Sequence, residues 1–372
     1  MLFRSSSATE QYDGTSWNTV PSLATARYAL GGSGTNTASL AFGGAVSTTV
    51  SAATEEYNSN INAITKAAWA SGANMPANTN QGAGSGTQTA ALITGGKTGP
   101  GGGSLSTQTV EYDGSAWTAG GAYPAPSTQM GAFGIQTATV CMGGDQPSQS
   151  PTVTNVANAY NGTSWTSINA MNNYRYNIVG QGVGVQTAGL IAGGDDGITS
   201  PVDDLSAVEE YNGSTWTAVS ALSTARGGSS VNIGTQTACI AAYGTNPGAG
   251  GPPGFPTWFD NTEIYNGSVW TAGPKTNTLR RGGIGSSGTL TNGIAFGGYF
   301  NPITYLNTSE KYDGTSWVSS ANLATARSGI GSADSSGDAA LGAGGYTGVT
   351  SNAVEEFTGE IQTVTASTLT TS

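Results

Sequence analysis

The chain lacks histidine altogether, and this absence narrows its chemistry. Histidine is the commonest general base near neutral pH, the base of hydrolytic triads and the usual ligand of transition metals. With only two cysteines besides, the sequence offers no ligand set for a zinc or copper centre. We therefore expect a protein without catalytic residues rather than an enzyme of these classes.

Cysteine is scarce too, since Cys141 and Cys239 are the only two. Each falls in a small apolar run of a different repeat, and a further repeat separates them. Their Cα atoms are therefore expected to lie beyond the roughly 7 Å reach of a disulfide. We expect two free thiols that pack as small apolar side chains.

Charged residues make up only 9% of the chain, so serine, threonine, asparagine, glutamine and glycine must form most of its surface. Intracellular proteins usually carry about a quarter charged residues, and this composition favours the outside of a cell or particle. The net charge of −11 disfavours nucleic acids and anionic membrane surfaces as partners, because both attract basic proteins.

Long apolar runs are missing as well. No segment approaches the 18 apolar residues that a transmembrane helix needs, so we expect no membrane insertion. The opening Met1–Arg4 is not followed by the apolar core of a signal peptide. A composition typical of proteins outside the cell, without a secretion signal, is ordinary for a virion component, which leaves the cell by lysis. We therefore expect a virion or extracellular location.

What the chain does have is one pattern repeated about every 50 residues. An aromatic residue is followed by a polar-Gly pair and usually by a tryptophan, and the intervals between the aromatics run from 45 to 55 residues. The aromatic–tryptophan pairs expected to build the repeat are Tyr12 and Trp17, Tyr57 and Trp69, Tyr112 and Trp117, Tyr160 and Trp165, Tyr211 and Trp216, Tyr265 and Trp270, and Tyr312 and Trp317, with a last aromatic at Phe357.

A second element of the repeat is a small apolar run that ends in a glycine pair. The run occurs seven times: six copies end in a glycine pair, at Gly43–Gly44, Gly95–Gly96, Gly143–Gly144, Gly193–Gly194, Gly297–Gly298 and Gly344–Gly345, and one ends at Tyr243–Gly244. A glycine pair ends a strand where the chain is crowded or needs positive φ. The Asp-Gly and Asn-Gly pairs predict two-residue type I′ hairpin turns, and the aromatic residues are expected to pack between neighbouring units.

A period near 50 with four short strands per unit is typical of β-propellers, and the residues above resemble the kelch repeat family over about residues 9–359. The resemblance implies an all-β fold: a single seven-bladed kelch-like β-propeller of four-stranded antiparallel blades. Its ring would close by pairing N-terminal and C-terminal strands in one blade. Eight aromatic strands for seven blades leave one terminal copy redundant. We expect residues 1–359 to form the propeller and residues 360–372 a Thr/Ser-rich tail.

Two recurring charged positions are interpreted as structural, because an active site occurs once and a structural ladder recurs. A glutamate accompanies the aromatic residue at Glu10, Glu56, Glu111, Glu210, Glu310 and Glu356. An arginine recurs in the expected innermost strand at Arg27, Arg175, Arg226, Arg280 or Arg281, and Arg327. We expect these arginines to hydrogen-bond to neighbouring blades or to line the mouth of the central channel.

Loops that do not repeat are the better place for a binding site. Two of them, both following a glycine pair, are aromatic, and the candidate ligand-binding residues are Phe255, Trp258, Phe259, Tyr299, Phe300 and Tyr305. Trp258 is the one tryptophan outside the repeat. It serves either to hold its own proline-rich loop or as an aromatic platform for a sugar or a partner protein.

The acidic loop after Gly193–Gly194 is the one candidate metal site. Four carboxylates within ten residues offer oxygen ligands for Ca²⁺, and they are Asp195, Asp196, Asp203 and Asp204. Their spacing does not match an EF-hand, and the alternative is an ordinary solvated loop. Residues 360–372 are also open to two interpretations, a loose tail or a strand that adds to the sheet edge of a partner.

In style the chain resembles the Ser/Thr/Gly-rich kelch-like propellers of bacteriophages. That resemblance implies a non-enzymatic virion protein of a tail, fibre or surface decoration, binding a host-surface glycan or another virion protein and forming a homo-oligomer within a particle. A cellular kelch-type interaction scaffold and a glycan-active enzyme are the alternatives.

Overall fold

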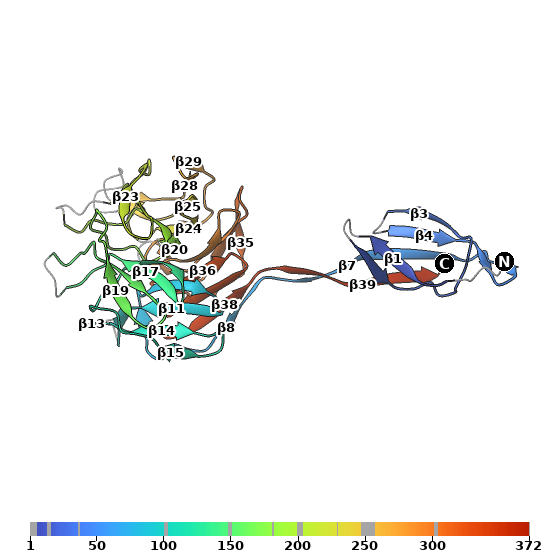
Figure 1. The fold of residues 1–372 in the computed structure, drawn as a ribbon, viewed down its shortest axis with the longest axis horizontal. Helices are drawn as coiled ribbons and strands as arrows, with labels where there is room; N and C mark the ends of the chain where they lie inside the picture. Colours follow the sequence, from blue (N-terminus) through green and yellow to red (C-terminus); the bar gives the residue numbers. More distant parts are fainter. Residues whose placement is uncertain are drawn as a thin grey trace. The chain divides into compact units, whose positions relative to one another are not determined.

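The computed structural model describes residues 6–12, 16–35, 38–99, 103–147, 151–180, 182–198, 204–228, 230–246, 257–300 and 304–371. Within these ranges the protein is all-β and contains no helix, and therefore none that could cross a membrane. The chain divides into two compact units. One is Ala67–Gly359, and the other combines Met1–Lys66 with Glu360–Ser372. Figure 1 traces the strands of both.

The larger unit contains six four-stranded antiparallel sheets, called sheets I to VI. In strand order, sheet I is β10 (Ala83–Thr87), β11 (Ala90–Thr94), β14 (Thr109–Tyr112) and β15 (Trp117–Ala119), and sheet II is β16 (Gly131–Ile135), β17 (Ala138–Met142), β18 (Ala157–Tyr160) and β19 (Trp165–Ile168). Sheet III is β20 (Val183–Val185), β21 (Ala188–Ala192), β22 (Val208–Tyr211) and β23 (Trp216–Ala218), and sheet IV is β24 (Val231–Thr235), β25 (Ala238–Ala242), β28 (Thr262–Tyr265) and β29 (Trp270–Gly273). Sheet V is β30 (Gly285–Thr289), β31 (Asn292–Phe296), β34 (Ser309–Tyr312) and β35 (Trp317–Ser320), and sheet VI is β36 (Gly331–Ser336), β37 (Ala339–Ala343), β38 (Val354–Thr358) and β8 (Ala68–Ser71).

Small two- and three-stranded sheets accompany the loops of this unit. They are β9 (Thr79–Asn80), β12 (Lys97–Thr98) and β13 (Ser104–Leu105); β26 (Thr245–Asn246) with β27 (Thr257–Trp258); and β32 (Tyr299–Phe300) with β33 (Thr304–Tyr305). Three of these strands, β12, β26 and β32, begin directly after Gly96, Gly244 and Gly298. The small sheets place side chains along one cavity.

The cores lie between adjacent sheets, which explains the small apolar runs. The second strand of each sheet is almost wholly buried, as in β21, where Leu190, Ile191 and Ala192 are fully covered. Phe133 and Val140 of sheet II pack with Ile191 and Trp216 of sheet III in one cluster. A short continuous apolar run between turn residues is what a strand covered on both faces requires. Cys141 and Cys239 are buried, free thiols, as predicted.

The tight turns differ from the prediction of two-residue type I′ hairpins. Pairing ends at Tyr160↔Trp165, which leaves a four-residue loop, and only Gly162 has a positive φ, of 90°. The Asn161 side chain is the reason: its Oδ1 accepts hydrogen bonds from the backbone N–H groups of Thr163 at 3.0 Å and Ser164 at 2.9 Å. An asparagine or aspartate that satisfies its own loop this way needs no left-handed conformation itself.

Hydrogen bonds from glutamine side chains join each of four sheets to the one before it. Gln136 Nε2 of sheet II donates to the carbonyls of Ala91 at 3.0 Å and Tyr112 at 2.7 Å in sheet I. Gln88 Nε2 of sheet I does the same to Ala340 at 3.2 Å and Phe357 at 2.7 Å in sheet VI. The first sheet therefore contacts the last, an arrangement consistent with a β-propeller.

Strands from the beginning and the end of the larger unit share sheet VI. β38 pairs with β8 in the register Phe357↔Trp69. The expected count of seven blades in one ring is not confirmed. Six four-stranded sheets share the Ala67–Gly359 unit, and the seventh belongs to the other unit.

The recurrent arginines are buried in ion pairs within their own sheets rather than bonded to neighbouring blades or lining a channel. Arg175 is fully buried and donates to Gly193 O at 2.6 Å, Ala207 O at 3.0 Å and Glu209 Oε1 at 2.8 Å. The same pairing joins Arg27 to Glu55, Arg226 to Glu263, Arg280 to Glu310 and Arg327 to Glu355. The acid in each pair lies two residues before the aromatic.

The glutamate directly before the aromatic has a different partner, the tyrosine hydroxyl of the next sheet. Tyr112 donates to Glu356 at 2.5 Å, Tyr160 to Glu111 at 2.5 Å, and Tyr265 to Glu210 at 2.9 Å. Burial, with the hydrogen bond to Glu356, raises the pKa of Tyr112 to about 12. These acids therefore connect sheets.

The smaller unit holds the remaining strands. β1 (Thr9–Tyr12) pairs with β2 (Trp17–Val20), and β5 (Ala45–Val46) pairs with β6 (Thr49–Val50). The four-stranded sheet consists of β3 (Gly31–Gly34), β4 (Ala38–Phe42), β7 (Thr54–Thr65) and β39 (Ile361–Thr371). The C-terminal segment, expected to be a loose tail or a strand for a partner, is thus a strand of the chain's own sheet, paired with β7.

Candidate functional site

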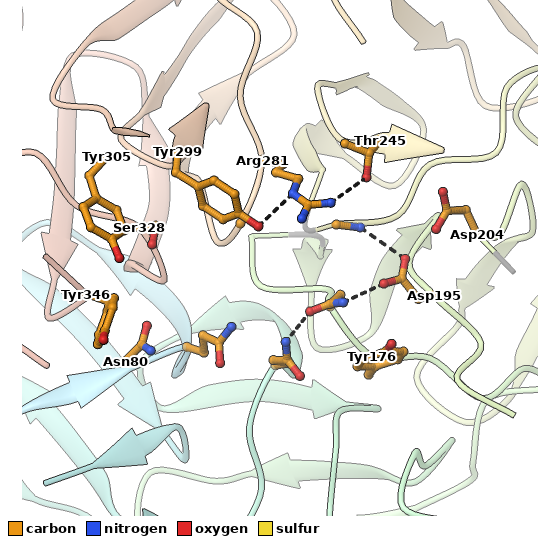
Figure 2. Close-up of a pocket in the computed structure, with 15 residues that line it drawn as sticks. Asn80, Tyr176, Asp195, Asp204, Thr245, Arg281, Tyr299, Tyr305, Ser328 and Tyr346 are labelled. Atoms are coloured by element: carbon orange, nitrogen blue, oxygen red, sulfur yellow. Dashed lines mark hydrogen bonds between the residues drawn. The ribbon is translucent and has the colours of Figure 1, made fainter. Parts of the chain in front are cut away.

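One cavity of about 690 Å³ lies in the larger unit, and its lining comes from the loops and entry segments of all six sheets. The residues that line it are Asn80, Gln81, Gln129, Tyr176, Asn177, Asp195, Asp204, Gly228, Thr245, Arg281, Gly282, Tyr299, Tyr305, Ser328 and Tyr346. Figure 2 shows these side chains converging on one space. Amides, hydroxyls and tyrosine rings predominate, with one arginine and two aspartates.

Three kinds of position in the repeat supply this lining, apart from Asp204 and Tyr305. The first two follow the buried arginine, or its equivalent, by one and two residues, as Tyr176 and Asn177 follow Arg175. The third is the residue directly after a glycine pair, as Asp195 follows Gly194. Because every repeat places these positions alike, the fold brings variable residues from distant parts of the chain to one cavity.

The position two residues after the arginine has positive φ in all six repeats of the larger unit. Three of the six are glycines, and the φ values are 59° at Gln81, 59° at Gln129, 53° at Asn177, 65° at Gly228, 82° at Gly282 and 64° at Gly329. A left-handed conformation is uncommon for glutamine and marks strained backbone that the surroundings must hold in place. The strain therefore concentrates at the cavity.

Backbone hydrogen bonds link successive members of this set. Gln81 N donates to Gly329 O at 2.8 Å, Gln129 N to Gln81 O at 3.1 Å, Gly282 N to Gly228 O at 2.8 Å, and Gly329 N to Gly282 O at 2.9 Å. Between Asn177 and Gly228 the backbone hydrogen bond is replaced by a bond to a side chain: Gly228 N donates to Asp195 Oδ1 at 3.1 Å. Asp195 thus connects the two halves of the set.

Asp195 is also the end of a chain of side-chain amides. Gln129 Nε2 donates to Asn177 Oδ1, and Asn177 Nδ2 donates to Asp195 Oδ2 at 2.6 Å (Figure 2). The carboxyl is therefore held at both oxygens, and it is only 6% exposed. Residues from sheets II, III and IV meet in this network.

The carboxyls of Asp195 and Asp204 occupy the space that a side chain at position 227 would fill. The two residues are bridge partners, and a Cβ built on Gly227 would stand 1.7 Å from Asp195 Oδ1 and 2.1 Å from Asp204 Oδ1. Gly227 has no positive φ, so the space alone demands glycine here. Two carboxyls this close disfavour the ionisation of both at once, which raises the affinity of the pair for a proton.

Arg281 is the one arginine of the lining, and aromatic rings hold it. Its guanidinium carbon lies 5.2 Å from the ring centroids of both Trp258 and Tyr299, and its Nε donates to the Tyr299 hydroxyl at 2.7 Å. Gly282 makes room for this arrangement, since a Cβ there would stand 1.9 Å from the Tyr299 ring. The side chain is thereby fixed with its fork toward the cavity (Figure 2).

The candidate ligand-binding residues lie in different surroundings, and only some of them line the cavity. Tyr299 and Tyr305 line the cavity, while Trp258 stands behind Arg281 and packs edge-on against Phe300 at 5.4 Å. Phe259 is buried beneath Arg226, whose guanidinium carbon lies 5.3 Å from its ring, so it has a structural role. Phe255 lies outside the described residues. The two aromatic loops therefore do meet.

The candidate calcium ligands are only partly brought together. Asp195 and Asp204 are adjacent, Asp196 does not line the cavity, and Asp203 lies outside the described ranges. Among the residues described, no group of three His, Cys, Asp or Glu side chains is arranged to hold a metal ion. The contact between two carboxyls, with amide and backbone donors around it, is the geometry of a shared proton.

Several lining residues were not foreseen from the sequence. Tyr176, Asn177, Gln81 and Gln129 lie in segments whose spacing repeats with the buried arginine, whereas Arg281 was named beside Arg280 as one of the recurring arginines. The available signal was positional: the two residues after Arg175, Arg226, Arg280 and Arg327, or after Thr79 and Ser127 where the arginine is replaced.

Comparison with known proteins adds nothing to this geometry, since no family model matches the chain and no curated protein matches it in sequence.

The buried carboxyl predicts a pH effect on stability. Burial raises the pKa of Asp195 above its ordinary value of 3.8, while the hydrogen bonds from Asn177 and from Gly228 offset part of the rise. The folded protein then holds a proton more tightly than the unfolded chain, so this contribution is present at low pH and lost as pH rises through the folded pKa. Asp195→Asn should therefore lose less stability than the wild type as pH rises above about 4.

Urea unfolding of both proteins over a pH series measures this difference directly. Carboxyl carbon shifts in NMR spectra would report the Asp195 titration independently. Parallel stability curves for the two proteins would contradict the raised pKa.

Proposed function

We propose that this chain is a non-enzymatic recognition protein of a phage particle, part of a tail, fibre or surface decoration. Its Ala67–Gly359 unit would be a six-bladed kelch-like β-propeller, and the cavity would bind a host-surface glycan. A location on the virion follows from the same proposal.

The ring proposal is supported by contacts that run in cyclic order. The innermost strands neighbour one another as β10, β16, β20, β24, β30 and β36, and β36 neighbours β10 again. Trp117 Nε1 of sheet I donates to Ala73 O, next to β8, at 2.8 Å, which repeats the contact of Trp165 Nε1 with Gly121 O at 3.0 Å between sheets II and I. One contact geometry thus recurs from first sheet to last.

The composition of the cavity carries the glycan proposal. Amide and hydroxyl groups surround the space, and the rings of Tyr176, Tyr305 and Tyr346 contribute apolar faces. Sugars present the same combination, hydroxyls around the edge and C–H groups on the faces, and concave sites of 300–1,000 Å³ are usual for small ligands. A cavity of about 690 Å³ has room for a short oligosaccharide segment.

The acidic residues support a role without catalysis. A glycosidase holds its two carboxyls about 5 Å or more apart, so that the glycosidic bond fits between them. Asp195 and Asp204 instead meet at the space above Gly227. The buried glutamates are engaged with arginines or tyrosines of the scaffold, as described above.

The experiment that tests this function is binding of fluorescently labelled protein to intact candidate host bacteria, with unlabelled protein as competitor. Saturable binding that the unlabelled protein displaces is expected. Absence of displaceable binding to every plausible host would contradict the adhesion role.

A second candidate, assembly within the particle, is favoured by the surface of the smaller unit. Seven of the fifteen exposed large apolar side chains in the described part of the chain belong to it: Tyr12, Trp17, Leu30, Leu40, Phe42, Val50 and Ile361. Contiguous exposed apolar surface often marks a protein contact. Sedimentation of the purified chain as a concentration-dependent oligomer would support this candidate.

A further inference from the structure

We infer that the ligand in the cavity is an uncharged saccharide, with the guanidinium of Arg281 donating to its hydroxyls and the amide oxygens of Asn80 and Gln81 accepting from them. This inference rests on the proposed function and deepens it, because it names the class of glycan. Four observations support it.

The first is the charge balance of the site. Among the described residues of the lining, Arg281 is the only cationic side chain, and the acids are Asp195 and Asp204. Because the two carboxyls meet at Gly227, single ionisation of the pair is favoured over double ionisation, and Arg281 balances one negative charge. A carboxylated or amino-bearing sugar would leave one charge uncompensated in a partly enclosed cavity, whereas a neutral sugar leaves the balance intact.

The second is the rigidity of Arg281. The arginines that precede the inner strands are each engaged by a buried glutamate, while Arg281 is held by the rings of Trp258 and Tyr299 instead. Its Nε donates to Tyr299 and its Nη1 reaches Thr245 Oγ1 at 3.5 Å, so the guanidinium is held in place while its remaining N–H groups suit the hydroxyls of a sugar ring. Lysine at this position would keep the charge but lose the fork.

The third is a pair of acceptors on the wall formed by the entry to sheet I. Asn80 Oδ1 and Gln81 Oε1 are buried and have no hydrogen-bond partner among the described residues. Gly329 leaves space for the first of them, since a Cβ there would stand 1.8 Å from Asn80 Oδ1. Buried acceptors without donors are unfavourable, and sugar hydroxyls would supply the missing donors.

The fourth is the placement of the tyrosines. Tyr176 comes from the entry to sheet III, while Tyr305 and Tyr346 come from loops of sheets V and VI and meet edge-on at 5.9 Å. Figure 2 shows Tyr176 apart from the other two across the cavity. Aromatic faces at separate walls can each cover the C–H face of a sugar unit.

The test is an array of neutral, carboxylated and amino-bearing oligosaccharides probed with the full chain, followed by calorimetric titration of the strongest binder. We expect a neutral oligosaccharide to bind, with an affinity that changes less than about threefold between low and high salt, since screening has no net charge to act on. We expect Arg281→Lys to weaken binding at least about tenfold, because the loss of a bidentate contact is not compensated by charge.

Lys275→Met is the matched control, since Lys275 is an exposed cation, paired with Asp260 at 2.9 Å and outside the cavity. It should bind as the wild type does. Unchanged melting temperatures of both variants would show that binding, not folding, is affected. Tighter binding of a carboxylated or amino-bearing sugar, full affinity in Arg281→Lys, or no binding of any neutral sugar would each overturn the inference.

The cell-binding assay separates this inference from the proposed function. Adhesion to bacteria that Arg281→Lys leaves intact would overturn the inference while the adhesion role stands. Arg281-dependent binding of a neutral oligosaccharide without adhesion to any host would support the inference and remove the adhesion role.

Discussion

Replacing Trp69 by alanine should destabilise the larger unit by about 3 kcal/mol, a value at the low end for core tryptophans because Trp69 is half-buried. Its ring lies 4.6 Å from that of Phe296 and 5.2 Å from that of Phe357. Its Nε1 donates to Ser309 Oγ at 3.1 Å and to Ala321 O at 3.0 Å. Trp69 therefore joins sheet VI to sheet V, and its loss opens the junction where the two ends of the unit meet.

Trp17 is the matched control, because it occupies the equivalent place in the repeat and is 67% exposed. Trp17→Ala should change the free energy of unfolding of the larger unit by less than about 0.5 kcal/mol, as exposed positions usually do. Chemical unfolding followed by far-UV circular dichroism compares the two. A larger effect at Trp17 than at Trp69 would contradict the pairing of β8 with β38 in sheet VI.

The second large effect is expected from the buried ion pair of sheet III. Glu209→Gln should cost about 3–5 kcal/mol, because it leaves the buried Arg175 without its counter-charge. Glu209 also accepts from the backbone N–H groups of Asn172 at 2.6 Å and Asn173 at 3.1 Å, so the turn before Arg175 loses stability too. Urea unfolding at neutral pH measures this cost.

Asp260→Asn provides the comparison for this prediction. It removes the partner of exposed Lys275, and exposed pairs contribute about 0–1 kcal/mol. Equal and small effects of Glu209→Gln and Asp260→Asn would contradict the structural role assigned to the buried pairs.

Much of the fold was predictable, because each repeat of the sequence contains the strands of one sheet. The aromatic–tryptophan pairs mark the third and fourth strands, and the run before each glycine pair marks the second. Periodicity specifies how one sheet folds, but the number of sheets in a unit depends on which terminal strands pair. Phe357 pairs with Trp69, although Tyr12 and Trp17 carry the same pattern. Local sequence does not distinguish these two pairings.

The hairpin turns were predicted wrongly for a similar reason. Asp-Gly and Asn-Gly are compatible with a two-residue turn and with a longer loop capped by the Asx side chain. The serine and threonine residues that follow, such as Thr163 and Ser164, supply the N–H donors for the longer loop. Their recurrence after each Asx-Gly pair was the signal that favoured it.

The site was predictable only in part. The aromatic loops drew attention to Trp258 and Tyr299 because their composition is unusual, and both contact Arg281. Gln81, Gln129 and Asn177 have ordinary composition, and their importance comes from a left-handed backbone that only the structure reveals. The acidic loop was left open between a calcium site and an ordinary solvated loop, and the absence of a side chain at Gly227 lets two of its carboxyls approach each other.

The central claim is that the cavity is the recognition surface, and one comparison tests it most directly. Labelled wild-type protein and a Tyr176→Ala/Arg281→Lys double variant would be titrated onto the same host bacteria, with folding of both checked by thermal unfolding. The account predicts saturable binding for the wild type and a loss of at least about tenfold in affinity for the variant, which removes contacts contributed by the entries to sheets III and V. Equal binding of the two folded proteins would contradict it and direct attention to another face.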